Sequence, residues 1–431
     1  MFLSTVLVLL VLLARTQAAR RVNGAYLHIP FCRRRCYYCN FPIKVVGDRA
    51  STQLAETEAY VDLLLREIAA AAPEWGEQQQ QQSPAQLETV YFGGGTPSLL
   101  TPGQVTKILR ALDVNFGILP QAEVTLEMDP GTFDLPTLES FLRGGVTRVS
   151  MGVQSFDAEV LTRCGRAHSA QDVDMAIAHC HAAGLENFSV DLISSLPGVS
   201  LESWRDTLHR AVDTGCSHVS VYDLQVEDKT AFGRWYQPGR FPLPSDDESA
   251  AMYSTAVQVL GEAGFEHYEV SNYARSGYRS RHNQKYWRCE SVAGFGMGAA
   301  SYVDEVRATR PESLPSYRGW LFGVESGIKE GTTPYSAAVA ALPGSERGEA
   351  LDGIMLALRT ADGLDMDQLA SMHGRPVADK VLAGVAKFAG QGLVELRRGR
   401  PPDCGVRWLR LTDPKGFLVS NDIISTIFAQ F

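Results

Sequence analysis

Short runs of apolar and β-branched residues alternate along this chain with longer segments whose apolar residues recur at helical spacing. Strand-like runs fall at residues 88–92, 123–128, 148–152, 187–193 and 218–224. Helix-like segments separate or precede them, for example at residues 54–72, 170–183 and 200–213. Alternation of strand and helix, repeated about six times, predicts parallel strands with right-handed crossovers, which close most naturally into a full or partial barrel.

The pattern changes after about residue 336. We expect helices at residues 345–360, 366–372 and 375–389, strands at 392–396 and 406–411, and an amphipathic segment at 416–428. This order resembles a winged-helix-like module. Its inter-strand loop holds Arg397, Arg398 and Arg400, which fit either nucleic-acid binding or a solvated wing tip on a domain that covers the barrel.

Composition favours a solvated wing tip over nucleic-acid binding as the interpretation of that arginine cluster. The chain has 431 residues, of which 45% are hydrophobic and 21% charged, and its net charge is −9. That length predicts about two domains. A protein that binds duplex nucleic acid presents a basic face, so the acidic balance argues against that class and leaves small-molecule ligands open.

An apolar run from Phe2 to Ala14 opens the sequence. A short stretch with basic residues follows this run and ends at Arg21. The run is shorter than the roughly 20 residues that span a bilayer, so we expect no stable membrane span. It is typical of a signal-peptide core, although the usual basic start is missing. We interpret residues 1–21 as a targeting-like segment. An organellar signal (mitochondrion or plastid) is favoured, while a secretory signal or a misassigned start, which would make the protein cytoplasmic, stays open.

Three cysteines, Cys32, Cys36 and Cys39, carry the most specific chemistry in the sequence. Their spacing is CxxxCxxC, and the next cysteine is Cys164. Three thiolates on one short loop can bind three irons of a [4Fe–4S] cube and leave the fourth iron open. S-adenosylmethionine is the natural occupant of that position, and its reductive cleavage is a route to radical chemistry. A zinc site with His28 as fourth ligand and a disulfide with a spare thiol are the weaker alternatives.

Glycines and polar residues follow several of the predicted strands, at the ends where a barrel places its active site. The run from Gly93 to Pro97 follows one strand, and its successive N–H groups can hold a carboxylate. Glu127 ends the next strand and requires a partner if it is buried. Gln154, Arg166 and Asp191 occupy later strand ends and loops. Taken singly, each of these side chains also fits a polar network inside the barrel.

The cysteine run, with His28 to Phe31 before it and Phe41 after it, resembles the radical SAM group that contains the HemN dehydrogenases and the HemW heme chaperones. The resemblance extends from about Tyr26 to the C-terminus. It implies a partial (β/α)6 TIM-like radical SAM barrel with a C-terminal winged-helix-like α+β domain. We therefore expect the barrel at residues 22–265, a connecting region at 266–335 and the C-terminal domain at 336–431.

The resemblance also implies which residues bind the cofactors. The three cysteines would hold the cluster, and the S-adenosylmethionine contacts would be Tyr26, Tyr38, Gly94, Gly95, Thr96, Glu127, Gln154, Arg166 and Asp191. A second stretch, residues 282–287, looks like the HNxxYW motif of the HemW group, which has been tied to heme. Histidine is a common axial ligand of heme iron, so His282 is the expected heme ligand. Outside this family, a core-facing aromatic pair with a capping histidine would explain the motif better.

Phe41 separates the two subgroups, because the HemN type carries a further cysteine at that position. The HemW type is therefore favoured, and it implies a protein that binds heme and delivers it to apo-hemoproteins, respiratory ones among them, with a possible homodimer. The alternative is an oxygen-independent coproporphyrinogen III oxidase, which decarboxylates propionate side chains by a radical route. Whether the protein is an enzyme stays open, and we expect no nucleic-acid partner.

Overall fold

The computed structural model describes residues 22–76, 86–347, 350–398 and 406–431. The predicted targeting-like segment, residues 1–21, lies outside these residues. So does Arg400 of the predicted wing tip. Within the described residues, no helix is both long and apolar enough to cross a membrane.

Six consecutive parallel strands form the centre of a 12-stranded sheet. Each pairs in parallel with the next along the chain, so the predicted partial (β/α)6 barrel is confirmed. The strands are β1 (Gly24–Ile29), β4 (Leu87–Gly94), β5 (Ile118–Met128), β6 (Arg148–Gln154), β7 (Phe188–Ser194) and β8 (His218–Asp223).

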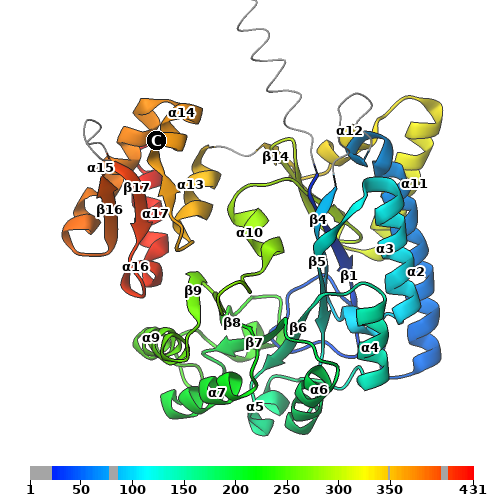
Figure 1. Cartoon of the computed structure of the whole chain (residues 1–431), viewed down its shortest axis with the longest axis horizontal. Helices are drawn as coiled ribbons and strands as arrows, with labels where there is room; N and C mark the ends of the chain where they lie inside the picture. The colour runs from blue at the N-terminus through cyan, green and yellow to red at the C-terminus, as the bar shows by residue number, and fades with distance from the viewer. Residues whose placement is uncertain (1–21, 77–85, 348–349, 399–405) are drawn as a thin grey trace, which may run out of the picture.

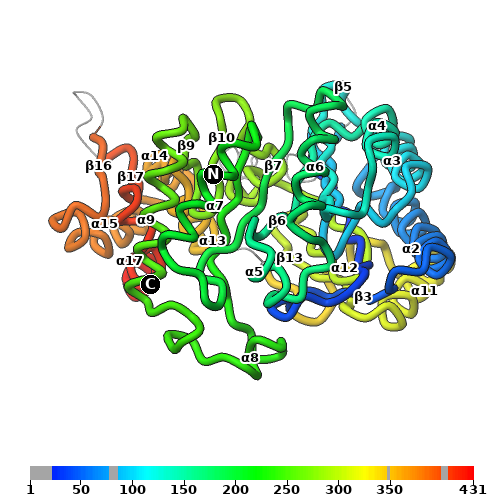
Figure 2. Tube along the Cα trace, turned by 90° about the horizontal axis from the view of Figure 1, so that it is seen from below, coloured from blue at the N-terminus to red at the C-terminus, as the bar shows by residue number. Residues whose placement is uncertain are grey.

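Helices cover the outer face of these strands (Figures 1 and 2). Three of them begin with a capping box, in which Thr101, Ser169 or Ser245 exchanges hydrogen bonds with the third helical residue. The covering helices are α2 (Ala50–Ala71), α3 (Pro102–Phe116), α4 (Leu135–Arg143), α5 (Ala158–Arg163), α6 (Ala170–Ala182), α7 (Leu201–Asp213) and α9 (Asp246–Glu262).

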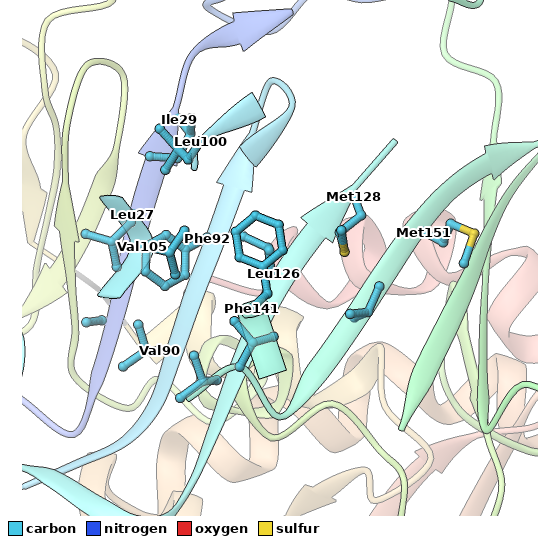
Figure 3. Packing of buried hydrophobic residues seen from close by; sticks show 14 of the residues in the cluster. Leu27, Ile29, Val90, Phe92, Leu100, Val105, Leu126, Met128, Phe141 and Met151 are labelled. Carbon is cyan, nitrogen blue, oxygen red and sulfur yellow. The ribbon is translucent and has the colours of Figure 1, made fainter. Parts of the chain in front are cut away.

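The strands are apolar on the face that meets the helices and polar on the inner face. Leu27, Phe92 and Leu126 belong to the core between the strands and the helices (Figure 3). Intervening positions such as Tyr91 and Glu127 point to the other face, since successive side chains of a strand alternate. The hydrophobic core therefore surrounds the barrel on its outside, and the interior is left for polar chemistry.

Residues after the barrel extend the sheet at both edges. On the β8 side, β10 (Asn272–Ala274) and β9 (Glu266–Glu269) pair antiparallel. On the β1 side, β11 (Val292–Phe295) pairs in parallel, and β12 (Ala300–Val303), β13 (Val306–Thr309) and β14 (Glu346–Arg347) follow antiparallel. Between the two edges runs α10 (Arg281–Trp287), and α11 (Leu314–Glu330) and α12 (Tyr335–Ala340) pack beside α2.

The C-terminal domain has a core of its own, which includes Ile354, Val381 and Leu409. Its elements are α13 (Ala350–Leu358), β15 (Leu364–Asp365), α14 (Met366–His373), α15 (Arg375–Gly390), β16 (Val394–Arg398), β17 (Val406–Leu411), α16 (Lys415–Leu418) and α17 (Ser420–Phe428). The predicted α+β organisation is confirmed. An isolated β-bridge between Glu269 and Thr360 joins this domain to the barrel sheet, and α10 lies between the two (Figure 1).

Candidate functional site

Cys32 ends β2 (Phe31–Cys32), and Cys36 and Cys39 lie on the loop from β2 to β3 (Lys44–Val45), just beyond the carboxyl end of β1. All three are free and half-buried. Burial, with smaller contributions from the nearby Cys39 and Cys36, raises the pKa of the Cys32 thiol to about 12. Holding thiolates in this position therefore requires strong positive charge, which coordinated iron supplies. The loop thus fits an iron–sulfur cluster.

Two side chains, one just after β4 and one on the loop between α5 and α6, donate hydrogen bonds to the cysteine sulfurs. The Thr96 hydroxyl lies 3.5 Å from Cys32 Sγ, and Arg166 Nη1 lies 3.3 Å from Cys36 Sγ. Donors of this kind are suited to sulfurs that carry negative charge, and they tune the potential of a cluster. The structure therefore brings the predicted residues Thr96 and Arg166 to the cysteine loop.

Arg166 is held by a buried polar network. Its Nη2 donates to the Asp129 carboxylate and to the Gly152 carbonyl (2.8 Å), and its Nη1 to the Tyr38 hydroxyl (3.2 Å). His168 also contacts Asp129, with Nδ1 2.9 Å from Oδ1. Burial works to raise the pKa of Asp129, but Arg166 and His168 together lower it below its usual range. The Asp129 carboxylate is therefore a fixed counter-charge that orients Arg166.

The glycine loop after β4 differs from the expected carboxylate nest, because its amides already have protein acceptors. Gly94 N–H donates to Glu127 Oε2 at 3.1 Å. The amides of Gly95 and Thr96 donate at 2.8 and 2.7 Å to backbone carbonyls just before Cys32. These amides are therefore not free for a ligand's carboxylate, whereas a backbone carbonyl is the kind of group that accepts from an ammonium group. The Thr96 carbonyl already accepts from the Leu99 amide at 3.0 Å.

Glu127 lies at the end of β5, where the sequence places it, and faces the barrel interior. Its Oε1 accepts a hydrogen bond from the Tyr91 hydroxyl at 2.8 Å, and Tyr91 stacks on Tyr26 with ring centroids 6.1 Å apart. Burial raises the pKa of Glu127 to about 7. A cationic ligand in the barrel would therefore favour the ionised form of this carboxyl.

Gln154 and Asp191, both predicted from the sequence, differ in whether their side-chain oxygens already have hydrogen-bond partners. Gln154 has a positive φ of 66°, and its buried Oε1 has no hydrogen-bond partner. Asp191 accepts hydrogen bonds from Ser150, Ser189 and Ser220 at 2.8, 2.9 and 2.6 Å. Asp191 therefore belongs to a polar network inside the barrel, whereas the orphaned oxygen of Gln154 fits a donor on a bound ligand.

His282 lies on α10 at the amino ends of the strands, opposite the cysteine loop. Its Nδ1 is 2.8 Å from Thr89 Oγ1, and its Nε2 is 3.0 Å from the Tyr286 hydroxyl. Its backbone N–H donates to Glu123. Burial lowers the pKa of His282 to about 3, so the imidazole is neutral. Coordination of iron by His282 would require Tyr286 or Thr89 to release a ring nitrogen.

Several residues of the site have no place in the sequence prediction. Asp129 is the easiest to find, because it follows a predicted strand directly. His168 and Tyr91 carry no local signal, since each matters only through a partner 39 or 36 residues away.

A half-open parallel barrel with a CxxxCxxC loop at its carboxyl edge defines a radical SAM protein. The Radical SAM superfamily model matches residues 26–211, and the HemN C-terminal domain model matches residues 348–404. The fold is also that of a solved structure, the radical SAM enzyme coproporphyrinogen III oxidase (HemN) from Escherichia coli. That match has a TM-score of 0.75 at 23% identity and covers 95% of this chain and 90% of that one.

Sequence relatives narrow the class. The heme chaperone HemW of Synechocystis sp. is 40% identical over 94% of this chain and 96% of its own. The heme chaperone HemW of Bacillus subtilis is 30% identical over 86% of this chain and 93% of its own. The mouse protein named radical S-adenosyl methionine domain-containing protein 1, mitochondrial, is 36% identical over 66% of this chain and 61% of its own. The chain belongs to the HemW family of radical SAM proteins.

Proposed function

We propose that this protein binds heme and passes it to apo-hemoproteins, respiratory ones among them. The observation that carries the proposal is the 40% identity with a heme chaperone over 94% of the chain. Phe41 supports it, because this position holds no additional thiol beside the cysteine loop and its side chain is 64% exposed. The similarity to HemN, at 23% identity, shows a shared fold alone.

We propose that Cys32, Cys36 and Cys39 hold a [4Fe–4S] cluster with S-adenosylmethionine at its open iron. When bound there, S-adenosylmethionine supplies a source of radical chemistry upon reductive cleavage. The carbonyls of the loop from Gly94 to Thr96 and the Glu127 carboxylate suit its ammonium group, and the free Gln154 oxygen accepts a further donor. Arg166, Asp191, Tyr26 and Tyr38 complete the proposed pocket from the surrounding network.

The test is an anaerobic heme titration of the cluster-reconstituted protein, followed by Soret absorption. Saturation near one heme per chain supports the proposal, and unsaturable binding or none refutes it. Coproporphyrinogen III is incubated in parallel with the protein, S-adenosylmethionine and a reductant. Formation of the decarboxylated product would instead establish the oxidase alternative.

We also propose an organellar location, since the mouse relative is named mitochondrial. Imaging the full chain with a fluorescent protein at its C-terminus tests this, beside a variant that lacks residues 2–21. An organellar signal that the deletion abolishes supports the proposal, and a cytoplasmic signal from both refutes it.

A further inference from the structure

A cavity of about 700 Å³ lies between α10 and the C-terminal domain, beside the contact that α10 makes with α13. We propose that this interdomain cavity is the heme site and that His373 is the axial ligand of the iron. The inference rests on the proposed function and deepens it. It places the heme on the outer side of the HNxxYW helix rather than on His282.

Part of the wall of the interdomain cavity is apolar and aromatic. Trp287, the last residue of the HNxxYW motif, lines it from α10, and Trp408 lines it from β17. Ile354 and Ala357 line it from one face of α13. Trp408 is 37% exposed although it is a large aromatic residue. Two indole rings and an aliphatic helix face suit a flat macrocycle, which needs apolar contact on both sides.

The rim of the cavity carries two arginines that share one carboxylate. Four arginines and three carboxylates line the cavity, and Glu266 binds Arg279 from outside the lining, so the charges of the cavity as a whole are balanced. Arg397 and Arg410 both pair with the single carboxylate of Glu395, at 3.0 and 2.6 Å, and both remain at least 40% exposed. One carboxylate cannot saturate two guanidinium groups. The remaining donors suit the carboxylate arms of a ligand.

The two histidines near α10 differ in whether their ring nitrogens are available. His282 is buried, and both of its nitrogens lie within hydrogen-bond distance of neighbours. His373 ends α14, lines the cavity and is exposed, and no described residue is hydrogen-bonded to its ring. An imidazole with a free nitrogen at the edge of an apolar cavity is a suitable axial ligand, and the adjacent Met372 offers a thioether beside it.

The ligand that matches these features is planar and largely apolar, with carboxylate groups and a metal that binds imidazole. Heme has all of these properties. A metal-free porphyrin has the ring and the carboxylates but not the iron. Comparing the binding of heme with that of a metal-free porphyrin therefore separates the contribution of His373 from that of the tryptophans and arginines.

The experiment is an anaerobic titration of the full chain with heme and, separately, with metal-free protoporphyrin. It compares the wild type with His373→Ala, the double variant Arg397→Ala/Arg410→Ala, and His282→Ala. His209→Ala and Arg398→Ala are matched controls, because both residues are exposed and neither lines the cavity. Far-UV circular dichroism of each variant verifies its fold.

We expect His373→Ala to shift the Soret band and to weaken heme binding by roughly tenfold or more, because the axial bond is lost. The same variant leaves protoporphyrin binding unchanged. The arginine double variant weakens the binding of both heme and protoporphyrin, and the two control variants leave both affinities unchanged.

Two results would overturn the proposal, and they are distinguishable. Normal heme binding by His373→Ala together with loss in His282→Ala would refute this site and leave the proposed function intact. Absence of saturable heme binding by the wild type would refute the proposed function, and this site with it.

Discussion

Removal of the Glu67 carboxylate should be among the most damaging single changes in this protein. Glu67 on α2 and Arg310 just after β13 are both fully buried, with Glu67 Oε1 2.9 Å from Arg310 Nε. Glu67 also accepts hydrogen bonds from Tyr317, Tyr335 and the Gly296 amide at 2.6, 2.9 and 2.7 Å. The Glu67→Gln variant keeps the size of the side chain but leaves the Arg310 guanidinium buried without a counter-charge.

The expected loss in the free energy of unfolding is about 3–5 kcal/mol, the usual cost of breaking a buried ion pair from one side. The neighbouring residue on the same helix supplies the control. Arg66 pairs with Glu325 at 2.5 Å, but its side chain is 45% exposed. Because water screens this surface pair, Glu325→Gln should cost at most about 1 kcal/mol.

Urea unfolding followed by far-UV circular dichroism measures both losses, provided that the slope of the transition is the same for each variant. A third variant, Glu67→Gln/Arg310→Met, removes both charges but keeps a side-chain carbonyl at position 67 as an acceptor for the buried donors of Tyr317, Tyr335 and Gly296. It should recover part of the stability, since no charge is left buried. The reasoning is refuted if Glu67→Gln costs no more than Glu325→Gln, or if the double variant is as unstable as Glu67→Gln.

Three further predictions concern the barrel mouth. The pKa of Glu127 in the folded protein is about 7, above its ordinary value of 4.5, so the folded state binds the proton more tightly than the unfolded state. Glu127 alone should therefore lower the unfolding free energy of the cofactor-free protein by about 3 kcal/mol as the pH rises from 4.5 to 7, and denaturation at several pH values should show a fall smaller by that amount in Glu127→Gln. Glu269, whose pKa burial also raises to about 7, contributes a similar slope in both proteins. Gly94 has φ 111°, and a Cβ there would lie 2.6 Å from the His28 ring; Gly94→Ala should cost about 1–3 kcal/mol of stability in thermal unfolding and abolish S-adenosylmethionine binding in calorimetry. Thr96→Val removes the hydrogen bond to Cys32 and should lower the reduction potential of a bound cluster, on the order of tens of millivolts in an EPR-monitored titration; an unchanged potential would contradict that role.

Much of the barrel is predictable because its strands are short, apolar on one face and followed by turn residues. The strand expected at residues 148–152 is β6 (Arg148–Gln154); in the C-terminal domain, the strand expected at 406–411 coincides with β17 (Val406–Leu411). The strands at the sheet edges, such as β9 and β10, escape prediction. They have only four and three residues, and the pairing that defines them comes from distant parts of the chain.

The candidate site is predictable in its residues but not in their hydrogen bonds. Residue type and position at strand ends indicate Glu127 and Gln154, and the structure brings both to the barrel mouth. The sequence does not reveal that the amides of the glycine loop are already in use. Nor does it reveal that Thr89, 193 residues away, binds a nitrogen of His282. Both facts depend on contacts between distant segments, which no local pattern encodes.

The cysteine loop and α10 lie at opposite ends of the same strands. This placement affects how S-adenosylmethionine and heme, the two proposed ligands, influence each other. In the proposed arrangement, S-adenosylmethionine at the cysteine loop does not obstruct heme at the other end, so both proposed sites can be filled at once. Inside the barrel, the Tyr91 ring lies 5.1 Å from that of His282 while its hydroxyl donates to Glu127, so side-chain contacts in the barrel interior connect the two ends. Thermodynamic reciprocity then fixes the outcome. Whatever factor S-adenosylmethionine applies to the affinity for heme, heme applies in return to the affinity for S-adenosylmethionine.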